Sequence, residues 1–256
     1  MKRVFVLFVM SLLLFSCSSR SKVAYFLDAK NNKTETLRTY VSRLQPDDLL
    51  SIIVNSKSDE LLSEFNRGLV SYQPINGAMI NSSMIQTYLI DKEGYIIFPT
   101  IGKMKLGGLT REEAVKKLTD AVRKHITDAT INLRILNFKV TVEGEVTRPG
   151  TYTINSERVT LLQALSLAGD LTIYGKRKNI LVIREQDDKR VYKVVDITST
   201  DFMNSEFYYL QQNDVVYVEP NKTRVNSSAV GPNTTAIISA ISVLVAVVAL
   251  IVNISR

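Results

Sequence analysis

The sequence predicts an α+β fold in two small units, followed by one long apolar helix. Residues 138–143 alternate between apolar and polar side chains, which is the period of a half-buried strand. A Pro149-Gly150 turn then leads into a second strand and a helix. A separate amphipathic helix begins at Thr110, with strand patterns on both sides of it. From residue 236 to residue 252 every side chain is apolar or Ser, which favours lipid over water.

Composition and charge describe an ordinary globular protein with an excess of basic residues. The chain has 256 residues, of which 45% are hydrophobic and 22% charged, and its formal net charge is +7. No block of five or six like charges occurs, so the concentrated basic face of a nucleic-acid-binding protein is not predicted. An acidic partner, such as a charged glycan or an anionic lipid, is compatible with this balance. The single cysteine excludes an internal disulfide.

The first residues have the pattern of a secretory signal peptide. A basic start is followed by an apolar run over residues 4–15, which is too short to span a membrane, and then by small residues. Leu14-Phe15-Ser16-Cys17 resembles a bacterial lipobox, in which the cysteine is acylated and becomes the mature N-terminus. We therefore predict a lipoprotein signal peptide over 1–16 and a polar, lipidated tether over 17–42. An ordinary signal peptide with an incidental cysteine is the alternative.

A first α+β unit is predicted over residues 43–136. It begins with a Pro46-Asp47-Asp48 turn that precedes an apolar strand. The segment 57–83 carries little signal, and we expect helical turns and loop there. Residues 88–90 and 95–99 have strand patterns separated by a Gly-containing turn, so they are expected to pair as a hairpin.

The helix of this first unit has a clear start signal. Thr110 and Glu113 have the spacing of a capping box, in which each side chain satisfies a backbone amide of the first turn. The apolar positions that follow keep helical spacing as far as about His125, where we expect the helix to end. Residues 131–135 then alternate as a strand that leads into the second unit.

A second unit is predicted over residues 137–220, and its element order suits a β-grasp module, in which a short sheet curls over one helix. Gly144 interrupts the first strand where a strand bulges or brings its backbone close to a neighbour. Thr160 is expected to open the helix and Gly169 to close it.

The end of the second unit repeats a theme of the first. Residues 179–184 and 190–195 are expected to form a second hairpin, and residues 210–218 the closing strand. Asp48-Leu49-Leu50 and Asp214-Val215-Val216 each place an aspartate directly before an apolar strand.

These motifs resemble a known family. Val-Glu-Gly-Glu-Val-Thr-Arg-Pro-Gly-Thr-Tyr at residues 142–152, followed by the helix at 160–169, is similar to the soluble-ligand-binding β-grasp (SLBB) domain. The Pro46-Asp47-Asp48 turn resembles the entry of the polysaccharide export N-terminal domain, where Gly is usual at the position of Asp47. Over residues 43–220 the chain resembles Wza-type polysaccharide export outer-membrane lipoproteins.

The resemblance implies an outer-membrane protein that is lipid-anchored at Cys17, with its soluble domains in the periplasm. It implies export of capsular or exopolysaccharide by a subunit of an oligomeric ring, which is an octamer in the family. An inner-membrane polysaccharide co-polymerase with tyrosine kinase activity is the implied partner. Transport would be passive conduction through the ring.

The C-terminal segment is predicted to be a membrane-spanning helix over 236–254 after a polar linker over 221–235. Small or polar side chains follow one another at helical spacing along this segment and let helices pack closely. This stripe consists of Ser239, Ser242, Ala246, Ala249 and Asn253. We predict that it faces neighbouring subunits or the axis of a ring; a featureless tail anchor is the alternative.

No catalytic, cofactor-binding or metal site is predicted. His125 is the only histidine, and it has no nucleophile or metal ligand at motif spacing. Glu143, Glu145 and Arg148 are the polar residues of the best motif, and a structural role is favoured over glycan contact. A second hypothesis for the function is a non-conducting, doubly anchored periplasmic lipoprotein that binds glycan or a partner. Assembly of the C-terminal helix into a ring would distinguish the two.

Overall fold

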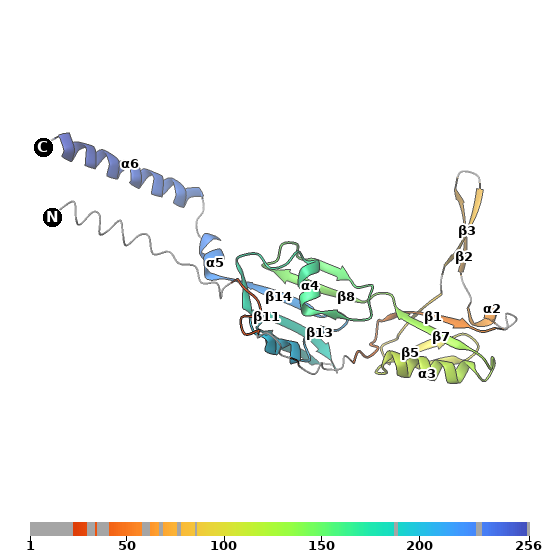
Figure 1. The fold of residues 1–256 in the computed structure, drawn as a ribbon. Helices are drawn as coiled ribbons and strands as arrows, with labels where there is room; N and C mark the ends of the chain where they lie inside the picture. Colours follow the sequence, from red (N-terminus) through yellow and green to blue (C-terminus); the bar gives the residue numbers. More distant parts are fainter. Residues whose placement is uncertain are drawn as a thin grey trace.

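The computed structural model describes residues 23–29, 34, 41–57, 62–66, 69–75, 78–84, 86–186, 189–228 and 232–254. Within these residues the fold is mixed α and β, as the sequence predicts. Two domains follow one another along the molecule, and two helices come after the second domain (Figure 1).

The first domain is built around a sheet with the order β4-β1-β7, in which both pairs are antiparallel. Its helix α3 packs on β7, and β5 and β6 form a separate hairpin. Its elements are β1 (Leu49–Asn55), α2 (Leu62–Phe65), β2 (Leu69–Ile75), β3 (Ala78–Met84), β4 (Thr87–Leu89), β5 (Tyr95–Phe98), β6 (Gly102–Lys105), α3 (Arg111–Val122) and β7 (Thr130–Ile135).

The capping box predicted for α3 is confirmed. Glu113 N–H donates to the Thr110 hydroxyl at 3.2 Å, and Thr110 N–H donates to the Glu113 carboxylate at 2.8 Å. Ala114, Leu118 and Val122 are buried on the face that meets the sheet. The helix ends at Val122, three residues before the expected end, so His125 lies in the following turn.

The predicted hairpin between 88–90 and 95–99 is wrong, although the turn between them forms. β4 pairs instead with β1, whose edge opposite β7 is otherwise open. β5 pairs with β6, across a turn in which Thr100 and Gly102 have positive φ. The predicted pairing of β4 with β5 and the observed pairings with β1 and β6 would satisfy the same backbone N–H and C=O groups. The hydrophobic pattern of the strands does not distinguish between these pairings.

The expectation of helical turns and loop for 57–83 is also wrong in part. α2 is a single helical turn, but β2 and β3 form an antiparallel hairpin that projects from the first domain in Figure 1. The sequence carries a signal for this hairpin, because Asn76-Gly77 is a preferred pair in two-residue hairpin loops. That dipeptide lies outside the described residues.

The second domain contains a five-stranded sheet with the order β12-β11-β14-β8-β9. Helix α4 lies against one face of this sheet (Figure 1), and β14 runs parallel to β8. Its elements are β8 (Lys139–Gly144), β9 (Gly150–Thr153), β10 (Val159–Thr160), α4 (Leu161–Leu167), β11 (Gly175–Gln186), β12 (Lys189–Val195), η2 (Thr200–Asn204), β13 (Tyr209–Leu210) and β14 (Val215–Pro220). The predicted hairpin and closing strand correspond to β11, β12 and β14.

Gly144 has the close backbone contact that its position in the strand predicts. Its φ is +89°, and a Cβ atom added there would lie 2.1 Å from the Val218 carbonyl oxygen. The next amide, of Glu145, donates to that same oxygen at 2.9 Å. A side chain at residue 144 would therefore separate β8 from β14, so only glycine fits.

Part of the predicted tether is bound to the second domain. Residues 25–28, which we call the strap, run beside residues 196–202, with Leu27 N–H donating to the Thr198 carbonyl at 2.7 Å. Phe26 stacks on Phe202 with ring centroids 6.1 Å apart. The Asp28 carboxylate accepts hydrogen bonds from Ser199 and Thr200 at the start of η2. The second domain is thus assembled from two distant parts of the chain.

Two helices follow β14. α5 (Lys222–Ser228) lies within the predicted linker, and α6 (Pro232–Ile254) confirms that the C-terminal apolar segment is helical. No helix in the part of the chain that the structure describes is both long and apolar enough to cross a membrane. The membrane-spanning prediction is therefore not confirmed.

Candidate functional site

Two turns of nearly identical geometry lie at the starts of β1 and β14. In residues 45–48 and 211–214, which we call the twin turns, the aspartate at the end accepts a hydrogen bond from the amide three residues earlier, at 2.8 Å in both. The residue before each aspartate, Asp47 or Asn213, has φ near +65° (67° and 64°). The repeated theme in the sequence is therefore a repeated backbone structure.

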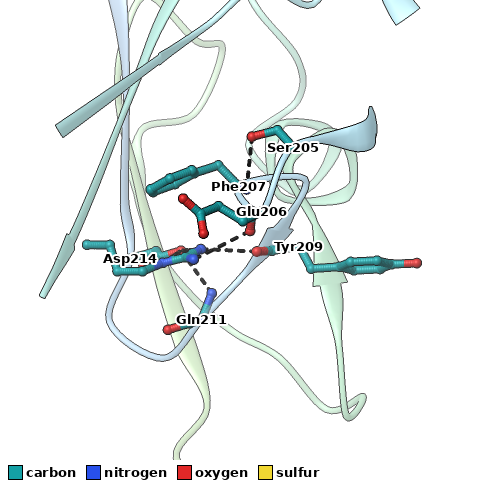
Figure 2. A network of polar contacts seen from close by, with 7 residues as sticks. Ser205, Glu206, Phe207, Tyr209, Gln211 and Asp214 are labelled. Carbon is teal, nitrogen blue, oxygen red and sulfur yellow. Dashed lines mark hydrogen bonds and ion pairs between the residues drawn. The ribbon is translucent and has the colours of Figure 1, made fainter. Parts of the chain in front are cut away.

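In the second twin turn the aspartate is paired with a buried arginine. Arg184 and Asp214 have exposed side-chain fractions of 3% and 0%, and their closest N···O distance is 2.7 Å. The guanidinium also donates to the Tyr209 carbonyl at 3.0 Å and stacks over the Phe207 ring at 4.5 Å. Figure 2 shows Gln211, Tyr209 and Asp214 close together in this polar network. Burial raises the pKa of the Asp214 carboxyl, and the guanidinium opposes that effect.

Among the described residues, no cation pairs with the aspartate of the first twin turn. Asp48 is 1% exposed, and its Oδ1 atom has no hydrogen-bond partner among the described residues. Burial raises the pKa of the Asp48 carboxyl to about 6, because the charged form loses its hydration without gaining a counter-charge. The twin turns therefore share a backbone and differ in electrostatics.

Asn137 joins the two turns where the domains meet. Its side chain accepts from Leu49 N–H at 2.9 Å and donates to the Asp47 carbonyl at 2.8 Å, both in the first domain. Its carbonyl accepts from the Gln212 side chain of the second domain at 3.0 Å. One residue thus fixes the start of β1 relative to the start of β14.

The polar residues of the second-domain motif serve mainly structural contacts. Glu145 accepts from Thr172 and from Arg224, both at 2.8 Å, which ties α5 to the sheet. Arg148 donates to the Leu167 carbonyl at the end of α4 at 3.2 Å. Glu143 is exposed on β8. These contacts agree with the structural role that the sequence favours.

A groove of about 1390 Å³ opens between the domains. One wall is the polar face of β7 with the start of α3, and the other is the loop 155–158 with Tyr209. Arg111 reaches across it to Glu157 with an N···O distance of 3.2 Å. Sequence reasoning missed this groove, because its two walls come from different domains.

The remaining predicted sites are placed as follows. Cys17 lies outside the described residues. The stripe Ser239, Ser242, Ala246, Ala249 and Asn253 lies on α6, where all five residues are exposed. Large apolar side chains of α6 are exposed as well, among them Ile241, Leu244 and Leu250. Within the described ranges, no three His, Cys, Asp or Glu side chains are grouped as a metal site.

Comparison with known proteins identifies both domains. Residues 37–136 match the family described as "Polysaccharide biosynthesis/export protein", and residues 138–218 match the SLBB domain. The chain belongs to the polysaccharide export protein family. The two matched regions are separated by Asn137 alone, the residue whose side chain joins the twin turns.

Two relatives of this polysaccharide export protein are named "EPS I polysaccharide export outer membrane protein EpsA". The one from Ralstonia solanacearum is 27% identical over 200 residues, which cover 75% of this chain and 52% of that protein. The one from Ralstonia nicotianae is 26% identical over 146 residues, which cover 56% of this chain and 38% of that protein. The chain thus spans about half the length, or less, of the curated relatives it matches.

Proposed function

We propose that this polysaccharide export protein carries exopolysaccharide across the bacterial outer membrane as a subunit of an oligomeric ring. The observation that carries the proposal is the uninterrupted succession of an export domain and an SLBB domain over residues 37–218. The names of both relatives, as outer-membrane exopolysaccharide export proteins, support it. The role is conduction, so we assign no catalytic residue.

The exposed apolar surface of α6 supports assembly at the membrane. Side chains such as Ile241, Leu244 and Leu250 are more than half exposed along the helix. A continuous apolar surface of this kind marks contact with lipid or with other protein. Small side chains on one face would let neighbouring helices approach closely, so we assign that face to subunit contacts.

The strap near the N-terminus and the helices α5 and α6 near the C-terminus both adjoin the second domain, which supports its placement nearer the membrane. The strap holds residues 25–28 on this domain, only eight residues after Cys17, and α5 and α6 follow its last strand. Acylation of Cys17 would therefore hold the second domain within about 30 Å of the membrane surface, the extended length of that segment. The first domain would extend into the periplasm, towards an inner-membrane polysaccharide co-polymerase.

The proposal is tested by removing the protein and by altering α6. Deletion should abolish surface polysaccharide, and the purified protein should form rings in electron micrographs taken in mild detergent. The stripe variant Ser242→Leu/Ala246→Leu should lower oligomer mass and surface polysaccharide, because larger side chains hold the helices apart. The matched control is Val243→Leu/Val247→Leu on the same helix.

Each outcome separates one part of the proposal from the rest. Normal surface polysaccharide in the deletion strain would refute the export function. A monomeric protein that binds glycan would favour the non-conducting lipoprotein instead. If the stripe variant keeps its oligomer and exports normally, α6 does not form the subunit contact.

A further inference from the structure

The groove between the domains has an excess of unpaired positive charge. Three arginines and two glutamates line it. Both glutamates lie near the same arginine, because Arg111 is 3.7 Å from Glu112 and 3.2 Å from Glu157. Arg134 and Arg158 have no carboxylate partner within the described residues. Two guanidinium groups are thus available to an anion from outside.

The two guanidinium groups are presented from opposite walls. Arg134 lies on β7, where Thr130 and Asn132 share its exposed face because alternate residues of a strand point the same way. Arg158 lies in the loop after β9, with its guanidinium 5.5 Å from the centre of the Tyr209 ring. This cation–π contact restricts the directions that the Arg158 guanidinium can take.

The polar part of the remaining lining, which lies beside apolar side chains such as Ile131 and Phe138, suits a sugar. The amide groups of Asn132 and Asn155 lie along the groove and can donate to or accept from sugar hydroxyls. The hydroxyls of Thr130 and Ser156 donate to the Asn55 and Arg158 carbonyls and can still accept from a sugar. Guanidinium groups bind carboxylates through two parallel N–H···O bonds. A chain of hydroxyl-rich rings that carries carboxylates matches both sets of groups.

We propose that this groove binds acidic segments of the exported polysaccharide, with Arg134 and Arg158 holding sugar carboxylates. The inference rests on the proposed export function and names the substrate class as an acidic polysaccharide. Both arginines remain open to water, so salt screens their attraction and binding is weak. Weak binding suits conduction, since a polymer that binds too tightly cannot leave the site.

The experiment uses the full chain in mild detergent and two soluble probes of equal length, an oligogalacturonate and a neutral malto-oligosaccharide. Calorimetric titration should detect the acidic probe, with affinity falling as salt increases, and should not detect the neutral one. Arg134→Gln/Arg158→Gln should weaken binding of the acidic probe about tenfold or more. The control Lys116→Gln/Lys124→Gln removes the same charge from exposed sites outside the groove and should leave binding unchanged.

Several results would overturn the inference. The groove does not recognise carboxylates if both probes bind equally, or if the acidic probe does not bind. The same conclusion follows if the control pair of substitutions weakens binding as much as the arginine pair does. Reduced oligomer mass in the arginine variant, with acidic binding retained, would make the groove a contact between subunits. Melting temperatures of the variants show whether they fold. The export function is judged separately, because loss of surface polysaccharide on deletion supports it whether or not the probe binds.

Discussion

Replacing each aspartate of the twin turns by Asn removes the same charge from the same backbone in two environments. In Asp214→Asn, the buried Arg184 loses its counter-charge, and removing one partner of such a pair costs about 3–5 kcal/mol. In Asp48→Asn, no cation is left unpaired within the described residues, and the amide oxygen can still accept from Gln45 N–H. We expect the second domain to lose most of its stability and the first to lose none.

The pKa of Asp48 sets the direction of the pH effect. The folded value of about 6 lies above the ordinary 3.8, so the folded protein binds the proton more tightly than the unfolded chain does. Stability from this group is complete below about pH 4 and is lost as the pH rises through 6, by about 3 kcal/mol at most. Asp48→Asn should abolish this loss, so at pH 7 the variant should be as stable as the natural protein, or more so.

Hydrogen exchange in increasing urea, read by mass spectrometry on the full chain in detergent, measures both domains in one experiment. Peptides from β1 report on the first domain and peptides from β14 on the second. The double variant Arg184→Met/Asp214→Asn should recover much of the loss, because no buried charge remains. Equal effects of the two Asn variants would refute the reasoning, since backbone geometry alone would then decide the cost.

Three further predictions concern single residues. Gly144→Ala should destabilise the second domain by at least about 2 kcal/mol in the same assay. Gly150→Ala should be nearly neutral, because beyond its two chain neighbours no atom lies within 4 Å of the added carbon. Asn137→Ala should cost about 1 kcal/mol per lost hydrogen bond and speed exchange at the start of β1; unchanged exchange there would refute its joining role. Cys17→Ser should abolish labelling by a fatty-acid analogue, and normal labelling would exclude acylation at this residue.

Local signals predicted those elements whose contacts are also local. The capping box at Thr110 and the hairpin of β11 and β12 each depend on residues near one another in the sequence. Gly144 is the exception: the glycine marked a close approach, but its partner Val218 lies 74 residues further along the chain. The pairing of β4 with β1 was missed, because the paired residues are 36 to 40 positions apart in the sequence and each strand had more than one possible partner. Pattern alone identifies strands more reliably than it identifies their partners.

The candidate sites were harder to predict, since they depend on how distant segments meet. Arg184 lies in an apolar strand, so the sequence pattern does not mark it as part of a site. The only related signal was the repeated aspartate, here Asp214, with which Arg184 forms a buried ion pair. The groove arises from two domains that Asn137 holds together, and no motif marks its guanidinium groups. The aromatic pair Tyr25-Phe26 was the one sign, within a polar segment, that the strap is bound.

The strap also determines the order in which the molecule can be completed. Its partners at residues 196–202 are about 170 residues further along the chain, whereas the first domain closes on itself within residues 41–136. During synthesis from the N-terminus the first domain can therefore fold while the strap still lacks its binding surface. Closing so long a loop is slow compared with forming local contacts. The strap is thus among the first segments to be synthesised and among the last to bind its partners in the second domain.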